Sequence, residues 1–225
     1  MSYKVLEIFY SIDGEGRRAG ELAVFVRMAG CNCSCSWCDT SYSQDCGGGK
    51  EMTIDEILKE LRKYNCHNIT LTGGEPLLQP NIGELIKEMY RQHYNVNIET
   101  NGTIDPTPYL KNPDEYGGEV WVTIDYKSKS SGMQSKMNLE AFRHLNGRDV
   151  VKFVVGSREE LEDADNFISE ILDYENAPEV YFSPVFGMIK PVEIVEFMKK
   201  QHYSSKVRVQ VQLHKIIWDP QERCV

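Results

Sequence analysis

Short apolar runs alternate along this chain with longer amphipathic segments, and this alternation constrains the fold more than any other feature. The apolar runs predict strands at 23–28, 68–72, 96–99, 120–124, 150–155, 180–183 and 207–213. The amphipathic segments predict helices at 53–64, 82–93, 138–145, 158–174 and 191–202. Strands that alternate with helices form parallel sheets. We therefore expect one α/β domain over residues 1–225, with six or seven mostly parallel strands either doubly wound or curled into a partial barrel.

Two local signals support the predicted helix starts. Thr53 and Glu56 have the spacing of a capping box, in which each side chain bonds the backbone N–H of the other residue. Pro191 suits the first turn of the last helix, where no backbone N–H is needed.

The ends of the predicted strands indicate where ligands would bind. In parallel sheets, ligands collect at the carboxyl ends of the strands. The loops 29–49, 73–76 and 100–102 each follow a predicted strand, so we expect them to meet at one edge.

Three cysteines crowd the first of these loops. Cys31, Cys35 and Cys38 have the spacing C-x3-C-x2-C, with Cys33 between them. Three thiolates can hold three irons of a [4Fe–4S] cluster, which leaves the fourth iron open to a small molecule. A closed zinc site with Cys33 as fourth ligand is an alternative, although Cys33 would point away from its neighbours in an extended segment. A redox or disulfide role is a further alternative.

Composition excludes some classes of protein. The net charge of −9 argues against a nucleic-acid-binding surface, which needs clustered basic residues. Apolar runs stay short of the 18 or so residues of a membrane span, and we see no signal peptide. We therefore expect a cytoplasmic protein that binds neither nucleic acid nor membranes.

A glycine-rich turn follows the second predicted strand. Gly73 and Gly74 let the backbone approach a ligand closely, and Glu75 offers a carboxylate to an ammonium group or a ribose. Taken alone, the sequence Gly-Gly-Glu-Pro is equally consistent with an ordinary turn between a strand and a helix.

The cysteine spacing and this turn together resemble the radical S-adenosylmethionine (SAM) superfamily, in which an aromatic residue, here Trp37, commonly precedes the last cysteine. The resemblance implies a partial (β/α) barrel whose open iron chelates the amino and carboxylate groups of SAM. The turn would hold the amino end of SAM. Reduction of the cluster would then cleave SAM to methionine and a 5′-deoxyadenosyl radical.

The flanking sequence narrows the resemblance. Ser-Ile-Asp-Gly-Glu-Gly at 11–16, Phe-Val-Arg-Met-Ala-Gly-Cys at 25–31 and Cys-Asp-Thr at 38–40 are similar to the 7-carboxy-7-deazaguanine synthase family. The segments 99–102 and 130–133, together with His214, Lys215 and Trp218, extend the similarity over essentially the whole chain.

The resemblance implies a lyase-type reaction on a small pterin. It would convert 6-carboxy-5,6,7,8-tetrahydropterin to 7-carboxy-7-deazaguanine, on the route to queuosine, with loss of ammonia. Hydrogen abstraction at C6 and ring contraction would regenerate SAM, with Mg²⁺ as a further cofactor. Relatives imply a homodimer and an electron donor such as flavodoxin or ferredoxin. A glycyl-radical activase and a non-catalytic zinc-binding module remain as alternatives.

The same resemblance assigns the site residues. Those expected to contact SAM are Trp37, Gly74, Glu75, Asp125, Tyr126, Lys127, Ser183, Pro184, Val185 and Phe186. Those expected to contact substrate are Ile12, Asp13, Gly14, Glu15, Arg27, Thr72 and Val225, the last in a tail (214–225) that would close over the site. The expected metal ligands are Cys31, Cys35 and Cys38 for iron and Thr40 for Mg²⁺.

Chemistry supports two of these assignments as catalytic. Glu15 can accept hydrogen bonds from the amino and imino groups of a pterin. Arg27 can bind a substrate carboxylate in a bidentate manner, although it could instead merely pair with a surface acid. Beside Thr40, Asp39 is chemically an equally suitable Mg²⁺ donor.

Two positions depart from the family pattern. Asp13 stands where glutamine is usual, which changes any side-chain contact but not a backbone contact. Asp125 and Tyr126 stand where relatives often have Ser-Pro before the retained Lys127.

Overall fold

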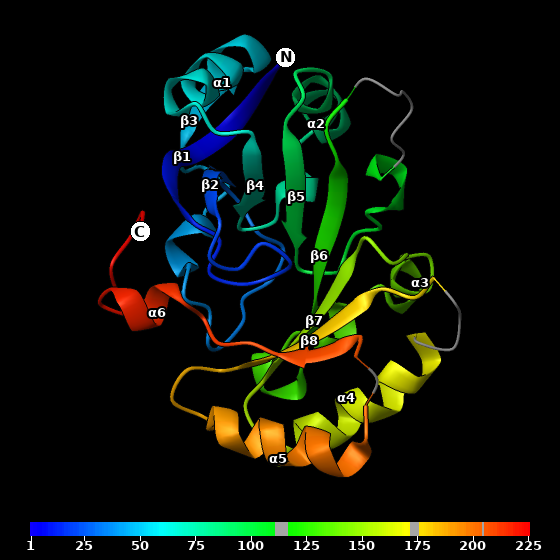
Figure 1. The fold of residues 1–225 in the computed structure, drawn as a ribbon. Coiled ribbons are helices and arrows are strands. Elements are labelled where there is room, and N and C mark those ends of the chain that lie inside the picture. Colours follow the sequence, from blue (N-terminus) through cyan, green and yellow to red (C-terminus); the bar gives the residue numbers. More distant parts are fainter. Residues whose placement is uncertain (111–116, 172–175, 204) are drawn as a thin grey trace.

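The computed structural model describes residues 1–110, 117–171, 176–203 and 205–225, and within these ranges nine strands form one sheet (Figure 1). The strands are β1 (Ser2–Ile12), β2 (Leu22–Met28), β3 (Lys50–Thr53), β4 (Asn68–Gly73), β5 (Asn95–Thr100), β6 (Val120–Lys127), β7 (Val150–Val155), β8 (Glu179–Pro184) and β9 (Val207–Val209). The α-helices of the same ranges are α1 (Ile54–Leu61), α2 (Ile82–Arg91), α3 (Leu139–Phe142), α4 (Arg158–Ile171), α5 (Pro191–Gln201) and α6 (His214–Ile217).

The sheet has the strand order β3-β1-β2-β4-β5-β6-β7-β8-β9. From β2 onward every neighbouring pair is parallel, which confirms the predicted parallel strands. Strands β1 and β3 add an antiparallel edge that the sequence pattern did not predict. β3 is only four residues long and largely exposed, so it carries little apolar signal.

The helices begin where the local signals predict. Thr53 caps α1 in a capping box, with its backbone N–H donating to Glu56 Oε2 over 2.8 Å. Pro191 occupies the first turn of α5. Helix α3 is shorter than predicted, and the predicted end of α4 at 172–174 lies outside the described residues.

The two faces of the sheet differ sharply in polarity. One face packs on the helices through apolar residues such as Leu71, Ile98 and Phe153, all fully buried. Figure 1 shows α1 and α2 beside the first half of the sheet and α4 and α5 beside the second half. The alternate residues face inward and are largely polar: Thr70, Thr72, Asn97, Glu99, Thr123, Asp125, Lys127, Lys152 and Ser183. Because a strand alternates its side chains, this polar face is a property of the sheet and not of one loop.

The turn between β1 and β2, residues 13–21, brings the two ends of the sheet together. Gly16 N–H donates to Gln210 Oε1 over 2.8 Å, and Leu213 N–H donates to the Gly14 carbonyl over 3.1 Å. Both partners follow β9, the last strand of the sheet. The sheet is therefore curled into a partial barrel whose open side is bridged by this turn.

A buried ion pair anchors the turn at the amino ends of the parallel strands. Arg18 Nε lies 2.9 Å from Asp13 Oδ2, with the side chains 8% and 2% exposed. The Arg18 guanidinium also donates to the carbonyls of Ile69 and Asn95, and Thr70 Oγ1 donates to Asp13 Oδ1 over 2.6 Å. Every charged atom of the pair thus has partners, which is the condition under which a buried charge is tolerated.

This pair predicts a large stability loss for Arg18→Met. The variant leaves the Asp13 carboxylate buried without its cation, which should lower the free energy of unfolding by about 3 kcal/mol. Urea denaturation of the iron-free protein measures the loss. The exposed Arg17, whose Nη1 donates only to the Arg148 carbonyl in the described contacts, provides the control Arg17→Met. Equal small losses in the two variants would contradict an anchoring role for Arg18.

Candidate active site

The cysteine-bearing loop after β2, residues 29–49, is called here the cluster loop, and hydrogen bonds tie it down on three sides. Within the loop, Gly30 N–H donates to the Ser43 carbonyl over 2.8 Å. Toward the loop after β6, Ser36 N–H donates to the Ser131 carbonyl over 3.1 Å. Toward the end of β5, Asn101 Nδ2 lies 3.6 Å from Cys31 Sγ. The loop is held against the neighbouring strand ends, as their order in the sheet predicts.

The Gly-Gly-Glu-Pro turn touches the cluster loop directly. Glu75 N–H donates to the Gly30 carbonyl over 2.8 Å. A Cβ on Gly74 would lie 2.3 Å from Gly30 O and 2.8 Å from Cys31 Cβ, so only glycine fits this approach. Gly73 has φ of 146°, a conformation that side chains other than glycine rarely adopt. Both glycines are therefore required by the packing of the turn on the loop.

The Glu75 carboxylate is buried and hydrogen-bonded to other groups of the protein. It is 0% exposed and accepts hydrogen bonds from Leu77 N–H (3.0 Å), Thr100 Oγ1 (2.8 Å) and Asn101 N–H (2.7 Å). Burial raises the pKa of Glu75 to about 7 despite these donors. The side chain thus ties the turn to the end of β5, and the turn presents backbone toward the cluster loop.

The cysteines of the cluster loop offer suitable donors for an iron–sulfur cluster. Cys31, Cys35 and Cys38 are half-buried free thiols. A hydrogen bond from the Cys33 thiol lowers the pKa of Cys31 to about 6, so Cys33 lies against Cys31 instead of pointing away from it. In the described ranges, no three His, Cys, Asp or Glu side chains converge as they would around one metal ion. A cluster is held differently, because its thiolates bind separate irons, and three thiols on one fixed loop fit that requirement.

Charged residues meet on the inner face of the sheet. Asp125 Oδ2 lies 2.9 Å from Lys127 Nζ, and its Oδ1 lies 3.0 Å from Lys152 Nζ. Burial would raise the pKa of Asp125, but the two ammonium groups hold it below its usual value. Glu15, from the turn between β1 and β2, lies 3.4 Å from Lys152 Nζ and accepts a hydrogen bond from Ser183. Predicted residues from three separate segments are thus brought together around Lys152.

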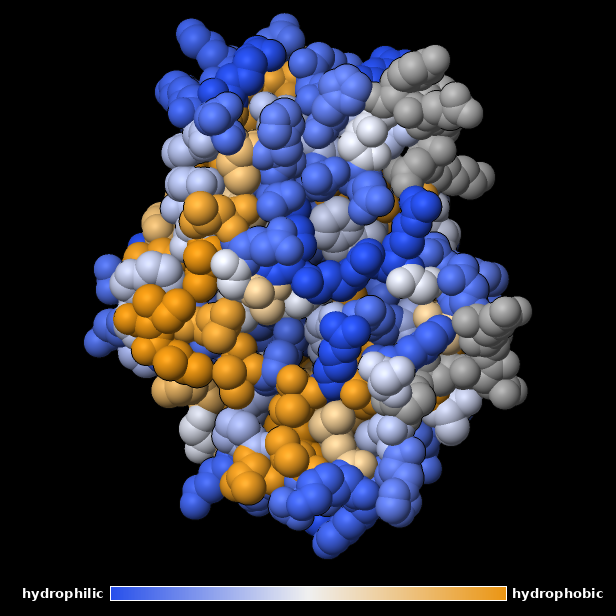
Figure 2. Space-filling model, in the orientation of Figure 1, coloured by the Kyte–Doolittle hydropathy of each residue, from blue (hydrophilic) through white to orange (hydrophobic). Residues whose placement is uncertain are grey.

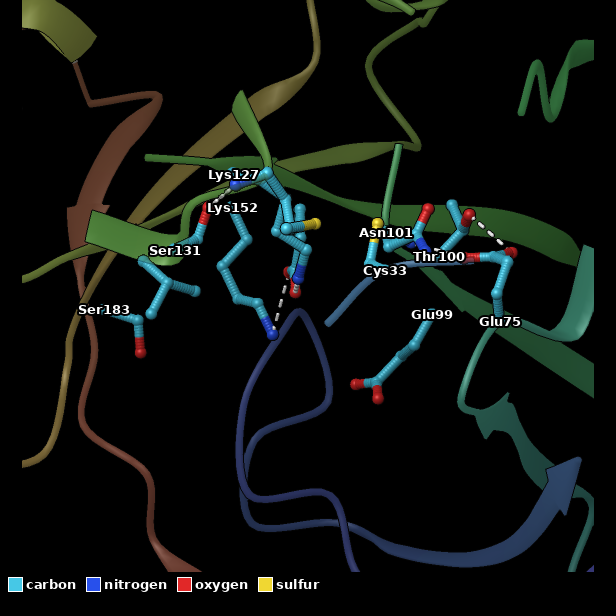
Figure 3. A network of polar contacts seen from close by, with 12 residues as sticks. Cys33, Glu75, Glu99, Thr100, Asn101, Lys127, Ser131, Lys152 and Ser183 are labelled. Atoms are coloured by element: carbon cyan, nitrogen blue, oxygen red, sulfur yellow. Dashed lines mark hydrogen bonds and ion pairs between the residues drawn. The ribbon is translucent and has the colours of Figure 1, made fainter. Parts of the chain in front are cut away.

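Glu99, on the neighbouring strand β5, also faces this group. Figure 3 shows Glu99 and Lys152 pointing into the same space from opposite sides, with Glu75, Thr100 and Asn101 beyond Glu99. Thr72 Oγ1 donates to Glu99 Oε2 over 3.1 Å. Burial raises the pKa of Glu99, since Lys152 offsets it only in part.

Trp37 connects the cluster loop to the same group. Its Nε1 donates to Ser130 Oγ over 3.1 Å, and Lys127 Nζ lies 5.6 Å from its ring centroid. The indole therefore covers the Lys127 ammonium from the cluster side, in the geometry of a cation–π contact.

Arg27 lies on β2 and pairs with Glu7 of β1. Its Nε is 2.6 Å from Glu7 Oε1, which also accepts a hydrogen bond from the Tyr42 hydroxyl over 2.9 Å. The tail reaches the same carboxylate, because Cys224 Sγ donates to Glu7 Oε2 over 3.1 Å. Val225, the next residue, is half-buried. The bond to Glu7 uses Nε, and the Nη groups of Arg27 supply further donors.

Thr40 and Asp39 lie side by side as oxygen donors. Thr40 Oγ1 donates to Asp39 Oδ1 over 2.8 Å, and Lys215 Nζ of α6 lies 3.1 Å from Asp39 Oδ2. Burial would raise the pKa of Asp39, but Lys215 and the Thr40 hydroxyl lower it to about 2. A hydroxyl and an ionised carboxylate are hard donors, so the pair fits Mg²⁺.

Several predicted residues lie elsewhere or can act only through the backbone. The Tyr126 ring packs on Phe142, Phe153 and Phe167 on the helix side of the sheet. The Asp13 carboxylate accepts hydrogen bonds from Arg18 and Thr70.

The backbone of the segments around them still borders the site. Ile12 ends β1, and Gly14 adjoins His214, whose Nδ1 would lie 2.6 Å from a Cβ there. Pro184 and Val185 are buried after Ser183, whereas Phe186 is exposed, with Lys215 Nζ 5.5 Å from its ring centroid.

Sequence reasoning assigned no role to Lys152, Glu7 or Gln212. Lys152 did carry a signal, since it is the only charged residue in the apolar strand Val-Val-Lys-Phe-Val-Val. Gln212 Nε2 donates to Glu15 Oε2 over 3.3 Å, a contact between residues 197 positions apart that no local pattern indicates.

Comparison with known proteins agrees with this geometry. The family model described as the Radical SAM superfamily matches residues 25–138. A 7-carboxy-7-deazaguanine synthase of Clostridium acetobutylicum is 42% identical over 233 residues, covering 100% of both chains. A protein of the same name from Methanospirillum hungatei is 36% identical over 218 residues, covering 96% of this chain and 86% of that one. The crystal structure of QueE from Escherichia coli has a TM-score of 0.72 at 21% identity and covers 94% of each chain, which shows the fold.

The matched stretch contains the cluster loop and the Gly-Gly-Glu-Pro turn, so fold and site together define a radical SAM protein. Within that superfamily, the chain belongs to the 7-carboxy-7-deazaguanine synthase family. Membership confirms the predicted family and fold, and it favours the cluster over the zinc-binding and activase alternatives. The individual residue assignments stay predictions.

The contact of Gly74 with the cluster loop predicts the effect of Gly74→Ala. The added Cβ would overlap Gly30 O and Cys31 Cβ, so the loop must shift. We expect the variant to remain folded but to hold less than half the wild-type iron and sulfide after anaerobic reconstitution. Gly20→Ala is the control, because its Cβ would meet nothing closer than 4.0 Å. Gly20 has a positive φ and Gly74 does not, so the control adds backbone strain without the contact to the cluster loop. Normal iron content in Gly74→Ala would contradict the packing argument.

Proposed function

We propose that this chain is a radical SAM lyase that converts 6-carboxy-5,6,7,8-tetrahydropterin to 7-carboxy-7-deazaguanine with loss of ammonia. The observation that carries the proposal is the full-length, 42% identity to a protein named for this product. When bound, the [4Fe–4S] cluster, SAM and Mg²⁺ supply the hydrogen-atom abstraction and orient the carboxylate during ring contraction. The protein's own residues bind, orient and shield the reactants.

Glu15 and Arg27 are proposed to recognise the pterin. Glu15 is 11% exposed and is oriented by Lys152, Ser183 and Gln212, so its carboxylate is fixed before substrate arrives. A fixed acceptor suits the amino and imino edge of the pterin ring.

Arg27 would meet the other end of the substrate. Its pairing with Glu7 fixes Nε, so that the Nη groups can bind the substrate carboxylate. Thr72, the backbone of 12–14 and Val225 would complete the substrate pocket, and the tail bond from Cys224 to Glu7 supports a position of Val225 near Arg27.

For SAM, we propose contacts from the Gly74 and Glu75 backbone, Trp37, 125–127 and 183–186. The support is spatial, since Trp37 adjoins Lys127, and Lys127 adjoins Asp125. Cys31, Cys35 and Cys38 would hold the cluster, and Thr40, with Asp39 beside it, would hold Mg²⁺.

We further propose a cytoplasmic homodimer that receives electrons from flavodoxin or ferredoxin. All seven cysteines are free thiols, which suits a reducing compartment. No helix of the described residues is long and apolar enough to span a membrane.

Exposed apolar side chains of Phe186, Met188, Ile216 and Ile217 would suit a dimer contact. Figure 2 shows apolar residues gathered on the face over α6. Light scattering measures the molar mass in solution and so tests the homodimer. Turnover with reduced flavodoxin or reduced ferredoxin in place of dithionite tests each protein as the electron donor.

The proposal predicts a product in one assay. Reconstituted protein, incubated anaerobically with SAM, Mg²⁺, dithionite and the tetrahydropterin, should form 7-carboxy-7-deazaguanine in molar excess over SAM consumed, measured by mass spectrometry. Glu15→Gln should raise KM about tenfold or more, because an amide cannot accept on both atoms. Lys199→Met, which removes an exposed charge on α5, is the control and should behave as wild type. SAM cleavage without the deazaguanine product would contradict the proposed reaction.

A further inference from the structure

Lys152 is a charged residue in an otherwise apolar strand. It is the third residue of β7, where all six residues are buried. Its side chain is only 8% exposed. Lysine is rarely buried without a partner, because an isolated ammonium is costly to remove from water. The partners of Lys152 therefore show what the residue is for.

Those partners are carboxylates from two separate segments. Lys152 lies opposite Asp125 in the register of β6 and β7, with Nζ 3.0 Å from Oδ1. The same Nζ lies 3.4 Å from Glu15 Oε2 of the turn between β1 and β2. Burial would lower the pKa of Lys152, but Asp125, Glu15 and Glu99 raise it well above its usual value, so the side chain stays charged.

The two carboxylates face different ligands in the proposed function. Glu15 is the proposed acceptor for the pterin, and Asp125 lies in the segment proposed to contact SAM. Asp125 has a second cation, Lys127, at 2.9 Å. Ser183 and Gln212 also orient Glu15, but Lys152 is the cation that the described contacts place against it. One ammonium therefore lies between the substrate side and the SAM side.

We propose that Lys152 is a positioning residue that holds Glu15 and Asp125 at once and so couples the pterin subsite to the SAM subsite. This inference rests on the proposed function for the identity of the two ligands. Without the ammonium, Glu15 loses its cation and Asp125 keeps only Lys127, so the two like charges repel each other more strongly. Both ligands then lose part of their binding.

Equilibrium binding tests the proposal without turnover. The cluster-loaded protein, with no reductant, is titrated with SAM and separately with 6-carboxy-5,6,7,8-tetrahydropterin. In Lys152→Met, both dissociation constants should rise about tenfold, whereas Lys152→Arg, which keeps the charge, should recover most of both. In Lys152→Met/Asp125→Asn, Glu15 no longer faces the Asp125 charge, so pterin affinity should partly return while SAM affinity stays weak. This second variant also serves if Lys152→Met alone folds poorly.

Asp149→Asn is the matched control for loss of a buried charge. Asp149 directly precedes β7, is 1% exposed and accepts hydrogen bonds from Val122 and Asn146 backbone N–H groups. The variant should lose stability and keep both dissociation constants within about twofold of wild type, since the described contacts of Asp149 include neither Asp125 nor Glu15. Wild-type affinity for either ligand in Lys152→Met, or an equal loss in Lys152→Arg, would overturn the proposal. A wild type that binds SAM but not the pterin would contradict the proposed function itself, and this assignment with it.

Discussion

Charged side chains on the inner face of a parallel sheet must be paired, and the arrangement of the whole site follows from this constraint. Lys127 and Lys152 share Asp125, and Lys152 reaches across to Glu15. The same requirement is met at the base of the barrel, where Arg18 neutralises Asp13. Parallel strands are usually apolar on both faces, so the polar inner face marks this sheet as a binding surface. The apolar helix-side face supplies the stability that the polar face does not.

The cluster loop is held by the neighbouring strand ends as well as by hydrogen bonds within the loop. Glu75 bonds Asn101, whose side chain lies 3.6 Å from Cys31 Sγ, and Gly74 packs directly on the loop. Glu75 looks like a ligand-binding residue in the sequence, but its carboxylate is buried and bonded to three groups of the chain. Its contribution is to fix the turn so that backbone groups face the cysteines. Hydrogen bonds around metal ligands orient them in the same way.

Features that depend on residues close together in the sequence could be predicted, whereas contacts between residues far apart in the sequence could not. The parallel strands, the capping box at Thr53 and the cysteine spacing are local patterns, and the sequence predicted them. Strand β1 was missed because its alternation includes Glu7 and Ser11, which face the barrel and dilute the apolar signal. The pairing of Arg27 with Glu7 and of Glu15 with Lys152 depends on curling of the sheet, which no local pattern encodes. Tyr126 was assigned with its neighbours, yet alternation along β6 places its ring on the opposite face.

The central claim is that Cys31, Cys35 and Cys38 hold a cluster with one iron open to SAM, and electron paramagnetic resonance tests it directly. The reconstituted, reduced protein should give a [4Fe–4S]⁺ signal whose g-values change when SAM is added. Cys33→Ala should keep both the signal and the change, because the proposed iron ligands are Cys31, Cys35 and Cys38 alone. Cys31→Ala should lose the signal. Zinc in place of iron, a signal indifferent to SAM, or loss of the signal in Cys33→Ala would contradict the account.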